Sequence, residues 1–281
     1  MIQPRPPSRR TDDARPYGLA GPSLVGPPLP GQVFVEETID QLLDLLAAEL
    51  VVQAVACQRR FGDFELALSG GSTPQPLYDR LMYDPNCRRL PWARTHLWLV
   101  DERGVPLDDD RSNFRMINET IVQHSGIPRE QVHPIDPLSE TADVDYEAEL
   151  REVLQWRQRG QDRLDFVLLG MGQDGHTASL FPYNDALGER HRLVRCVDEP
   201  AAEPPHRVTM TFPLINSARM VAILVTGADK AEMIGRIAKG DASVEQLPIT
   251  GVRPGQGQLK WFLDAEACAA IEPPPREDAS S

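Results

Sequence analysis

The sequence predicts an α/β protein with a three-layer αβα fold, in which helices cover both faces of a mostly parallel β-sheet. Short apolar runs such as 64–68 and 220–225 alternate along the chain with longer segments of helical periodicity. These runs are apolar at nearly every position, as in strands that are buried on both faces. Strands that alternate with helices form parallel sheets, and 281 residues can bury the core of such a domain.

The individual elements follow from apolar spacing and from turn residues. The segment 38–57 places its leucines at 3- and 4-residue intervals, which is typical of an amphipathic helix. Pro74 stands in the first turn of the next helix, where proline is tolerated. The run 207–211 alternates as an edge or half-buried strand does. We expect strands at 64–68, 95–100, 164–169, 207–211, 220–225 and 259–263, and helices at 38–57, 74–83, 144–156 and 229–239.

The two ends of the chain differ in composition from its middle. Residues 1–30 hold eight of the 26 prolines and four arginines, with almost no apolar periodicity. Such a segment is typical of a disordered tail. The stretch 272–281 has the same character. The predicted organisation is therefore a tail over 1–30, a single α/β domain over 31–271 and a second tail over 272–281.

Charge and cysteine content exclude several classes of protein. The formal net charge of 29 − 42 = −13 argues against a protein that binds nucleic acid or an anionic membrane. No apolar run approaches the roughly 18 residues of a membrane span, and the N-terminus lacks the apolar stretch of a signal peptide. We expect a cytoplasmic protein, and no oligomeric partner is indicated. Neither a zinc site nor a disulfide framework is indicated by the four widely spaced cysteines, Cys57, Cys87, Cys196 and Cys268.

Polar sequences follow four of the predicted strands. They are 69–74 (Ser-Gly-Gly-Ser-Thr-Pro), 101–103 (Asp-Glu-Arg), 170–176 (Gly-Met-Gly-Gln-Asp-Gly-His) and 226–230 (Thr-Gly-Ala-Asp-Lys). Ligands of parallel sheets bind beyond the carboxyl ends of the strands. Because four such segments converge on one edge, we expect them to form a single site.

The loop 69–74 has the composition of a phosphate site. Gly70 and Gly71 permit close approach of the backbone, and Thr73 can cap the helix that Pro74 begins. Free amides at a helix N-terminus bind anions. We predict that Ser69, Gly70, Gly71, Ser72 and Thr73 hold a phosphate.

The same loop leaves a rival interpretation open. Ala67-Leu-Ser-Gly-Gly71 is close to the nucleophile elbow G-x-S-x-G, with alanine in place of the first glycine. Ser69 would then be a nucleophile with His176 as its base. The Ser-Thr-Pro that follows the second glycine favours an anion-binding loop instead.

His176 is the strongest candidate for proton transfer, because it directly follows a predicted buried strand in a glycine-flanked turn. Asp174 stands two residues earlier and can orient the imidazole. A histidine and an aspartate without further ligands nearby make a poor metal site. The pattern Gly170-x-Gly172-x-x-Gly175 also matches a dinucleotide fingerprint, but Pro182 leaves too few residues for the helix that this fingerprint opens.

Three basic residues can supply the donors that an anionic ligand needs on a protein of charge −13. Arg103 either neutralises Asp101 or aims its guanidinium at a phosphate or at developing negative charge, and in the last case it would be a catalytic residue with His176 and Asp174. Arg207 and Lys230 are ambiguous when each is taken alone, because most basic side chains are solvated. Together with the glycine loop, however, they can form an anion pocket.

These motifs resemble the superfamily of glucosamine-6-phosphate isomerases and 6-phosphogluconolactonases, and within it the lactonase family. The similarity spans about residues 33–268. It is carried by 69–74, Asp101-Glu-Arg103-x-Val-Pro106, Ser112-Asn113, the segment 168–182, Arg207-Val-Thr209 and Gly227-x-x-Lys230-Ala231. The resemblance implies a Rossmann-like sheet of the NagB/RpiA type.

The resemblance also implies roles for individual residues. His176 would be the general base that activates water, with Asp174 beside it. The loop 70–73, Arg207 and Lys230 would bind phosphate, while Arg103 and Asn113 would contact the substrate. The implied reaction is hydrolysis of 6-phospho-D-glucono-1,5-lactone, a sugar phosphate lactone, to 6-phosphogluconate in the oxidative pentose phosphate pathway. No metal and no organic cofactor is implied.

Two positions favour the lactonase over the isomerase branch. Asp101-Glu-Arg103 stands where that branch has Asp-Glu-Tyr, and Ser179-Leu-Phe-Pro182 stands where it has Phe-Asn-Glu-Pro. Tyr183 and the segment 248–252 depart from the lactonase pattern at the rim of the site. A glucosamine-6-phosphate deaminase and a non-catalytic sugar-phosphate sensor remain as alternatives.

Overall fold

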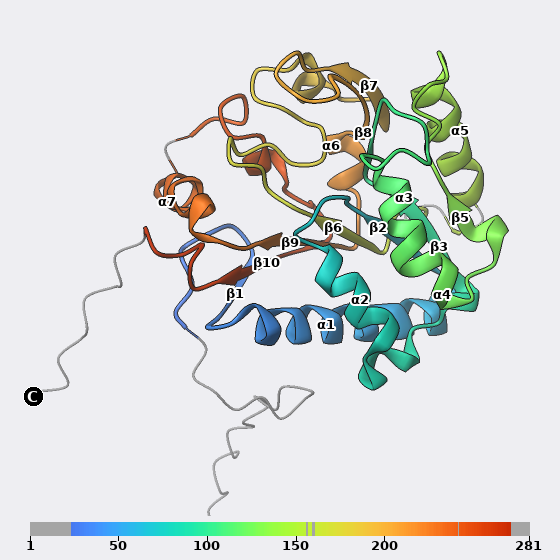
Figure 1. The fold of residues 1–281 in the computed structure, drawn as a ribbon, viewed down its shortest axis with the longest axis horizontal. Coiled ribbons are helices and arrows are strands. Elements are labelled where there is room, and N and C mark those ends of the chain that lie inside the picture. Colours follow the sequence, from blue (N-terminus) through green and yellow to red (C-terminus); the bar gives the residue numbers. More distant parts are fainter. Residues whose placement is uncertain (1–23, 156, 159–160, 241, 271–281) are drawn as a thin grey trace, which may run out of the picture.

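The structure is a computed structural model that describes residues 24–155, 157–158, 161–240 and 242–270. Its centre is a seven-stranded sheet with the order β1-β10-β9-β6-β2-β3-β5, in which every neighbouring pair is parallel. Helices flank this sheet (Figure 1), so the predicted α/β class is confirmed. The strands are β1 (Gln32–Glu36), β2 (Phe64–Leu68), β3 (Thr95–Leu99), β5 (Val132–His133), β6 (Phe166–Leu169), β9 (Met220–Val225) and β10 (Gln258–Asp264).

The middle strands of the sheet form the core. Every residue of β2, β6 and β9 is buried. Apolar side chains on both faces of these strands account for the near-continuous apolar runs in the sequence. β1 and β5 were not among the expected strands. β5 has two residues, and β1 pairs along one side only, with β10.

The helices are α1 (Ile39–Phe61), α2 (Gln75–Tyr83), α3 (Asn113–Ile117), α4 (Gln123–Ser125), α5 (Ala142–Leu154), α6 (Phe212–Ile215) and α7 (Ala231–Lys239). Thr38 Oγ1 accepts from the amide of Gln41 at the start of α1, and Gly62 ends that helix in the left-handed region. α1 and α2 run along one side of the large sheet (Figure 1). The expected capping of α2 by Thr73 is wrong, because Pro74 is the N-cap and no side chain caps the helix.

A second, antiparallel sheet stands beside the first. It has the order β4-β8-β7, from β4 (Asp101–Arg103), β7 (Val194–Asp198) and β8 (His206–Met210). In Figure 1 it lies on the side of the large sheet away from α1. Two expectations are corrected here. Residues 101–103 form a strand rather than a loop, and β8 is the middle strand of the small sheet rather than an edge strand.

The N-terminal boundary of the domain lies earlier than expected. Leu29 belongs to the hydrophobic core, and the indole of Trp261 donates to the carbonyl of Pro30 at 2.8 Å. Pro27 and Leu29, which were predicted as part of the tail, are buried and so pack onto the domain. The rest of the predicted tails, residues 1–23 and 272–281, lies outside the described part of the chain, as does Trp156. Among the described helices, none is long and apolar enough to cross a membrane.

Candidate active site

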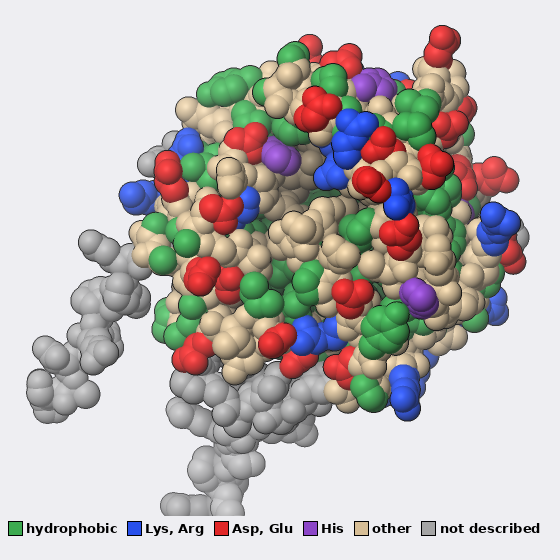
Figure 2. All heavy atoms as spheres, in the orientation of Figure 1, with side chains coloured by type: hydrophobic (Ala, Val, Ile, Leu, Met, Phe, Trp, Pro, Cys, Tyr) green, Lys and Arg blue, Asp and Glu red, His purple; other side chains and the backbone are tan. Residues whose placement is uncertain are grey.

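One cavity of about 740 Å³ lies beyond the carboxyl ends of β2, β3 and β6. Figure 2 shows this hollow with a histidine at one side and Lys or Arg side chains at the other. Ser72 and Lys230 are absent from its lining, whereas the other predicted site residues line it. These are Ser69, Gly70, Gly71, Thr73, Arg103, Asn113, Asp174, His176 and Arg207.

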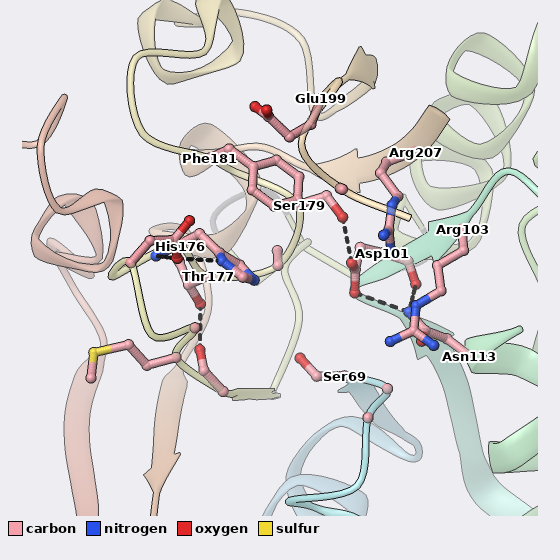
Figure 3. Close-up of a pocket in the computed structure, with 18 of the residues that line it drawn as sticks. Ser69, Asp101, Arg103, Asn113, His176, Thr177, Ser179, Phe181, Glu199 and Arg207 are labelled. Carbon is pink, nitrogen blue, oxygen red and sulfur yellow. Dashed lines mark hydrogen bonds and ion pairs between the residues drawn. The ribbon is translucent and has the colours of Figure 1, made fainter. Parts of the chain in front are cut away.

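His176 lies on one wall of the cavity (Figure 3). Asp174, which also lines the cavity, is paired with it. Oδ1 of Asp174 lies 2.6 Å from Nδ1 of His176 and also accepts from the His176 amide at 3.1 Å. Because a carboxylate can only accept, Nδ1 carries the hydrogen and Nε2 of the neutral ring keeps a lone pair. The pair therefore presents a base at Nε2. The side chain of His176 is about one-third exposed, so water can reach it.

Burial and hydrogen bonding act in opposite directions on Asp174. Burial alone raises the pKa of its carboxyl, but the hydrogen bonds from the ring and the amide of His176 outweigh burial and hold the pKa below its ordinary value. Asp174 therefore stays ionised and keeps its hydrogen bond to the imidazole. Gly172 makes this arrangement possible, since a Cβ there would lie 2.2 Å from Nδ1 and Cε1 of His176.

The glycine loop between β2 and α2 forms the floor of the cavity. Within the described residues, no hydrogen bond uses the main-chain amides of Gly70, Gly71, Ser72 or Thr73 as donors. These amides precede the N-terminus of α2, where an anion is stabilised. Ser69 is oriented differently from a nucleophile, because its hydroxyl donates to the carbonyl of Leu168 at 2.8 Å.

Arg103 and Arg207 form the wall opposite His176 (Figure 3). They are paired residues on the antiparallel strands β4 and β8, so their side chains leave the same face of the small sheet. Nη1 of Arg103 donates to the carbonyl of Arg111, and Nε and Nη2 of Arg207 donate to the carbonyls of Pro204 and Glu203. Each guanidinium keeps further N–H groups for a ligand.

The two guanidinium groups repel each other at this wall. Burial lowers the pKa of Arg207, and the charge of Arg103 lowers it further, against the charges of Asp101 and Glu102. Like charges directly opposite each other destabilise a sheet. An anion between them removes that repulsion, so the wall is suited to a phosphate.

Asp101, Asn113 and Ser179 form a hydrogen-bonded group beside the arginines. Asp101 accepts from the Ser179 hydroxyl at 2.6 Å and from the Asn113 amide group at 3.3 Å. The amide group of Asn113 also donates to the main-chain carbonyl of Asp101, whereas its buried Oδ1 has no partner in the described structure. The sequence analysis picks out the segment 101–103 but does not predict that Asp101 accepts hydrogen bonds in the cavity. The one signal for Asp101 in the sequence is its position directly after a predicted strand.

Lys230 is paired with a neighbouring carboxylate outside the cavity lining. Its Nζ pairs with Asp229 at 3.1 Å, and the other contact of that carboxylate is Gln173, a lining residue on the His176 side. Lys230 belongs to the segment that follows β9, whereas Arg207 belongs to β8 in the small sheet. Arg207 lines the cavity, whereas Lys230 is absent from its lining.

The structure also bears on a dinucleotide site and on a metal site. Residues 170–205 contain no α-helix, as expected for a false match to the dinucleotide fingerprint. Within the described residues, the side chains that could jointly hold a metal ion are Asp63, Glu65 and His96, whose ligand atoms lie within 4.8 Å of one another. They stand where β2 and β3 begin, at the edge of the sheet away from the cavity. Arg157 and Trp98 already contact the two carboxylates.

The chain is similar to known proteins in both sequence and fold. Residues 37–261 match the family model for glucosamine-6-phosphate isomerases/6-phosphogluconolactonase. A 6-phosphogluconolactonase of Synechocystis is 39% identical over 75% of this chain and 86% of its own length. The crystal structure of 6-phosphogluconolactonase from Thermotoga maritima has a TM-score of 0.70 at 32% identity, covering 83% of this chain and 99% of that one.

A larger relative shares only one segment with this chain. The human GDH/6PGL endoplasmic bifunctional protein is 40% identical over 81% of this chain, but the match spans only 29% of that protein. The family model matches most of this chain, and the alignment with the Synechocystis lactonase covers most of both proteins. This chain therefore belongs to the family of glucosamine-6-phosphate isomerases and 6-phosphogluconolactonases.

Proposed function

We propose that this protein hydrolyses 6-phospho-D-glucono-1,5-lactone to 6-phosphogluconate, a step of the oxidative pentose phosphate pathway. One observation carries the proposal: a base and an anion site stand on opposite walls of one cavity. The base is Nε2 of His176, and the anion site consists of Arg103, Arg207 and the free amides of the 70–73 loop. The substrate likewise has two separate groups to be recognised, a reactive carbonyl at C1 of the ring and a phosphate on C6 outside the ring.

The chemical step follows from this arrangement. Nε2 of His176 takes a proton from water as the water oxygen bonds to C1 of the lactone. The tetrahedral intermediate then breaks its bond from C1 to the ring oxygen, and the imidazolium returns the proton to that oxygen. Water and ester give a carboxylic acid and an alcohol, so the proton count balances. Asp174 stabilises the imidazolium between the two transfers.

The phosphate takes no part in the bond that breaks, so its binding energy serves to position the lactone. Arg103 carries the larger share of this role, because two of its nitrogens, Nε and Nη2, make no hydrogen bond within the described residues. Arg207 has one such nitrogen, Nη1. Lys230, which the sequence analysis also assigned to the phosphate, does not line the cavity.

The test is a lactonase assay corrected for spontaneous ring opening, run beside an assay for ammonia release from glucosamine 6-phosphate. We expect rapid hydrolysis of the phosphorylated lactone and no ammonia. Ammonia release without lactone hydrolysis would assign the protein to the deaminase branch. Binding of 6-phosphogluconate without turnover of either substrate would make it a sensor. Cytoplasmic location remains a prediction.

A further inference from the structure

Glu102 is a fully buried carboxylate directly behind the arginine wall. Successive residues of a strand point to opposite faces of the sheet, so Asp101 and Arg103 face the cavity while Glu102 faces away from it. Its position opposite Val208 in the ladder agrees with this orientation. A buried charge is costly unless it is well hydrogen-bonded, so the contacts of Glu102 indicate what it does.

Both carboxylate oxygens of Glu102 accept two hydrogen bonds. Oε1 accepts from the amides of Arg103 and Asn113, each at 2.7 Å. Oε2 accepts from the amide of Phe114 at 2.7 Å and from the hydroxyl of Ser112 at 3.0 Å. One side chain thus ties β4 to the first residues of α3, ten or more positions along the chain.

These contacts fix the two side chains that face the ligand. The amide of Arg103 is held by Glu102, and its guanidinium is held by the carbonyl of Arg111, which immediately precedes the Ser112–Phe114 turn. The Asn113 side chain is held by Asp101 while its amide is held by Glu102. Movement of the Glu102 carboxylate would therefore shift Arg103 and Asn113 together.

We infer that Glu102 is the positioning residue for phosphate binding: its ionised carboxylate holds Arg103 and Asn113 in the geometry that receives the ligand. This inference rests on the proposed function for the identity of the ligand. It predicts that loss of the carboxylate weakens binding of the phosphorylated end and leaves the proton transfer at His176 intact.

The charges around Glu102 predict a pH dependence. On its own strand, β4, Glu102 stands between Asp101 and Arg103. Two further titratable side chains near it are Arg207 on β8 and Tyr146 on α5. Burial raises the pKa of Glu102 above its ordinary value, although its four donors act to lower it. Protonation puts a hydrogen on an oxygen that accepts from two donors, so contacts that hold Arg103 and Asn113 are lost. We therefore expect KM to rise as pH falls through the raised pKa of Glu102.

The test compares Glu102→Gln with wild type. Glutamine keeps the shape but turns one accepting oxygen into a donor, so two of the four contacts are lost. We expect KM for the phosphorylated lactone to rise roughly ten- to hundredfold, with kcat within about threefold, and the rise of KM at low pH to disappear. Glu102→Asp keeps the charge and should recover part of the affinity. If the glutamine variant fails to fold, the KM of Glu102→Asp is compared with that of wild type instead.

Glu65→Gln is the matched control. Glu65 is likewise almost fully buried and accepts from the indole of Trp98, but it lies where β2 begins, away from the cavity. A Glu102→Gln variant with the same KM and pH profile as Glu65→Gln would overturn the inference.

A direct binding measurement separates this inference from the proposed function. Calorimetry with 6-phosphogluconate needs no turnover. If wild type hydrolyses no lactone but binds 6-phosphogluconate, and Glu102→Gln binds it at least tenfold more weakly, the proposed function fails while the inference stands. Equal binding by wild type and Glu102→Gln overturns the inference whatever the activity.

Discussion

The two walls of the cavity are built in different ways. The His176 wall is a loop whose shape depends on glycine, and its base needs only Asp174 to fix the tautomer. The arginine wall consists of paired strands and holds two like charges together, which requires a buried framework of hydrogen bonds behind them. A base can therefore be placed by a short local motif, whereas an anion site between like charges depends on residues distant in the chain.

The largest expected effect comes from His176→Ala on the loop wall. General base catalysis contributes about 10²–10⁴-fold, so kcat should fall by that factor. Calorimetry should show affinity for 6-phosphogluconate within about threefold of wild type, because the arginine wall is untouched. Near-normal turnover in this variant would remove His176 from the mechanism.

Asp174→Asn should have the next largest effect. Losing a hydrogen bond to a charged group costs about 1.5–3 kcal/mol, so we expect kcat to fall roughly ten- to hundredfold with little change in KM. Steady-state kinetics across pH will measure this. A larger change in KM than in kcat would instead place Asp174 in substrate binding.

The lowered pKa of Asp174 also has a consequence for stability. Its stabilising contribution is present above the pKa of an unfolded aspartate, about 3.9, and is lost as pH falls through the lower folded value. The difference in Tm between wild type and Asp174→Asn should therefore shrink on acidification below about pH 4. A difference that grows at low pH would contradict the direction of this shift.

Gly70→Ala tests the close packing between the glycine loop at the floor of the cavity and Asn113 beside the arginine wall. A Cβ at position 70 would lie 1.9 Å from Oδ1 of Asn113, so either the loop or Asn113 must move. We expect a loss of about 1–3 kcal/mol in unfolding free energy and a rise in KM of about tenfold. Gly188→Ala is the control, since a Cβ there meets nothing within 4 Å.

Lys230→Ala should have the smallest effect. Lys230 pairs with a half-exposed Asp229, and such pairs contribute about 0–1 kcal/mol. KM should change less than about fivefold, well below the change for Arg103→Ala. An effect as large as that of Arg103→Ala would return Lys230 to the phosphate site.

The sequence predicted the large sheet and the loop wall much better than the arginine wall. The buried runs of β2 and β9, and the glycines around His176, are local signals that need no tertiary context. β4 and β7 went unrecognised because they carry charged residues within strands of three and five positions. The role of Glu102 could not be predicted, because three of its four donors come from Ser112, Asn113 and Phe114 across a turn.

The central claim is that the two walls divide chemistry from phosphate recognition. The most direct test measures kcat/KM for 6-phospho-D-glucono-1,5-lactone and for unphosphorylated D-glucono-1,5-lactone in wild type, His176→Ala and Arg103→Ala. We predict that Arg103→Ala loses most of the preference for the phosphorylated lactone, while His176→Ala slows both lactones by a similar factor. Equal slowing of both lactones by Arg103→Ala would contradict the account.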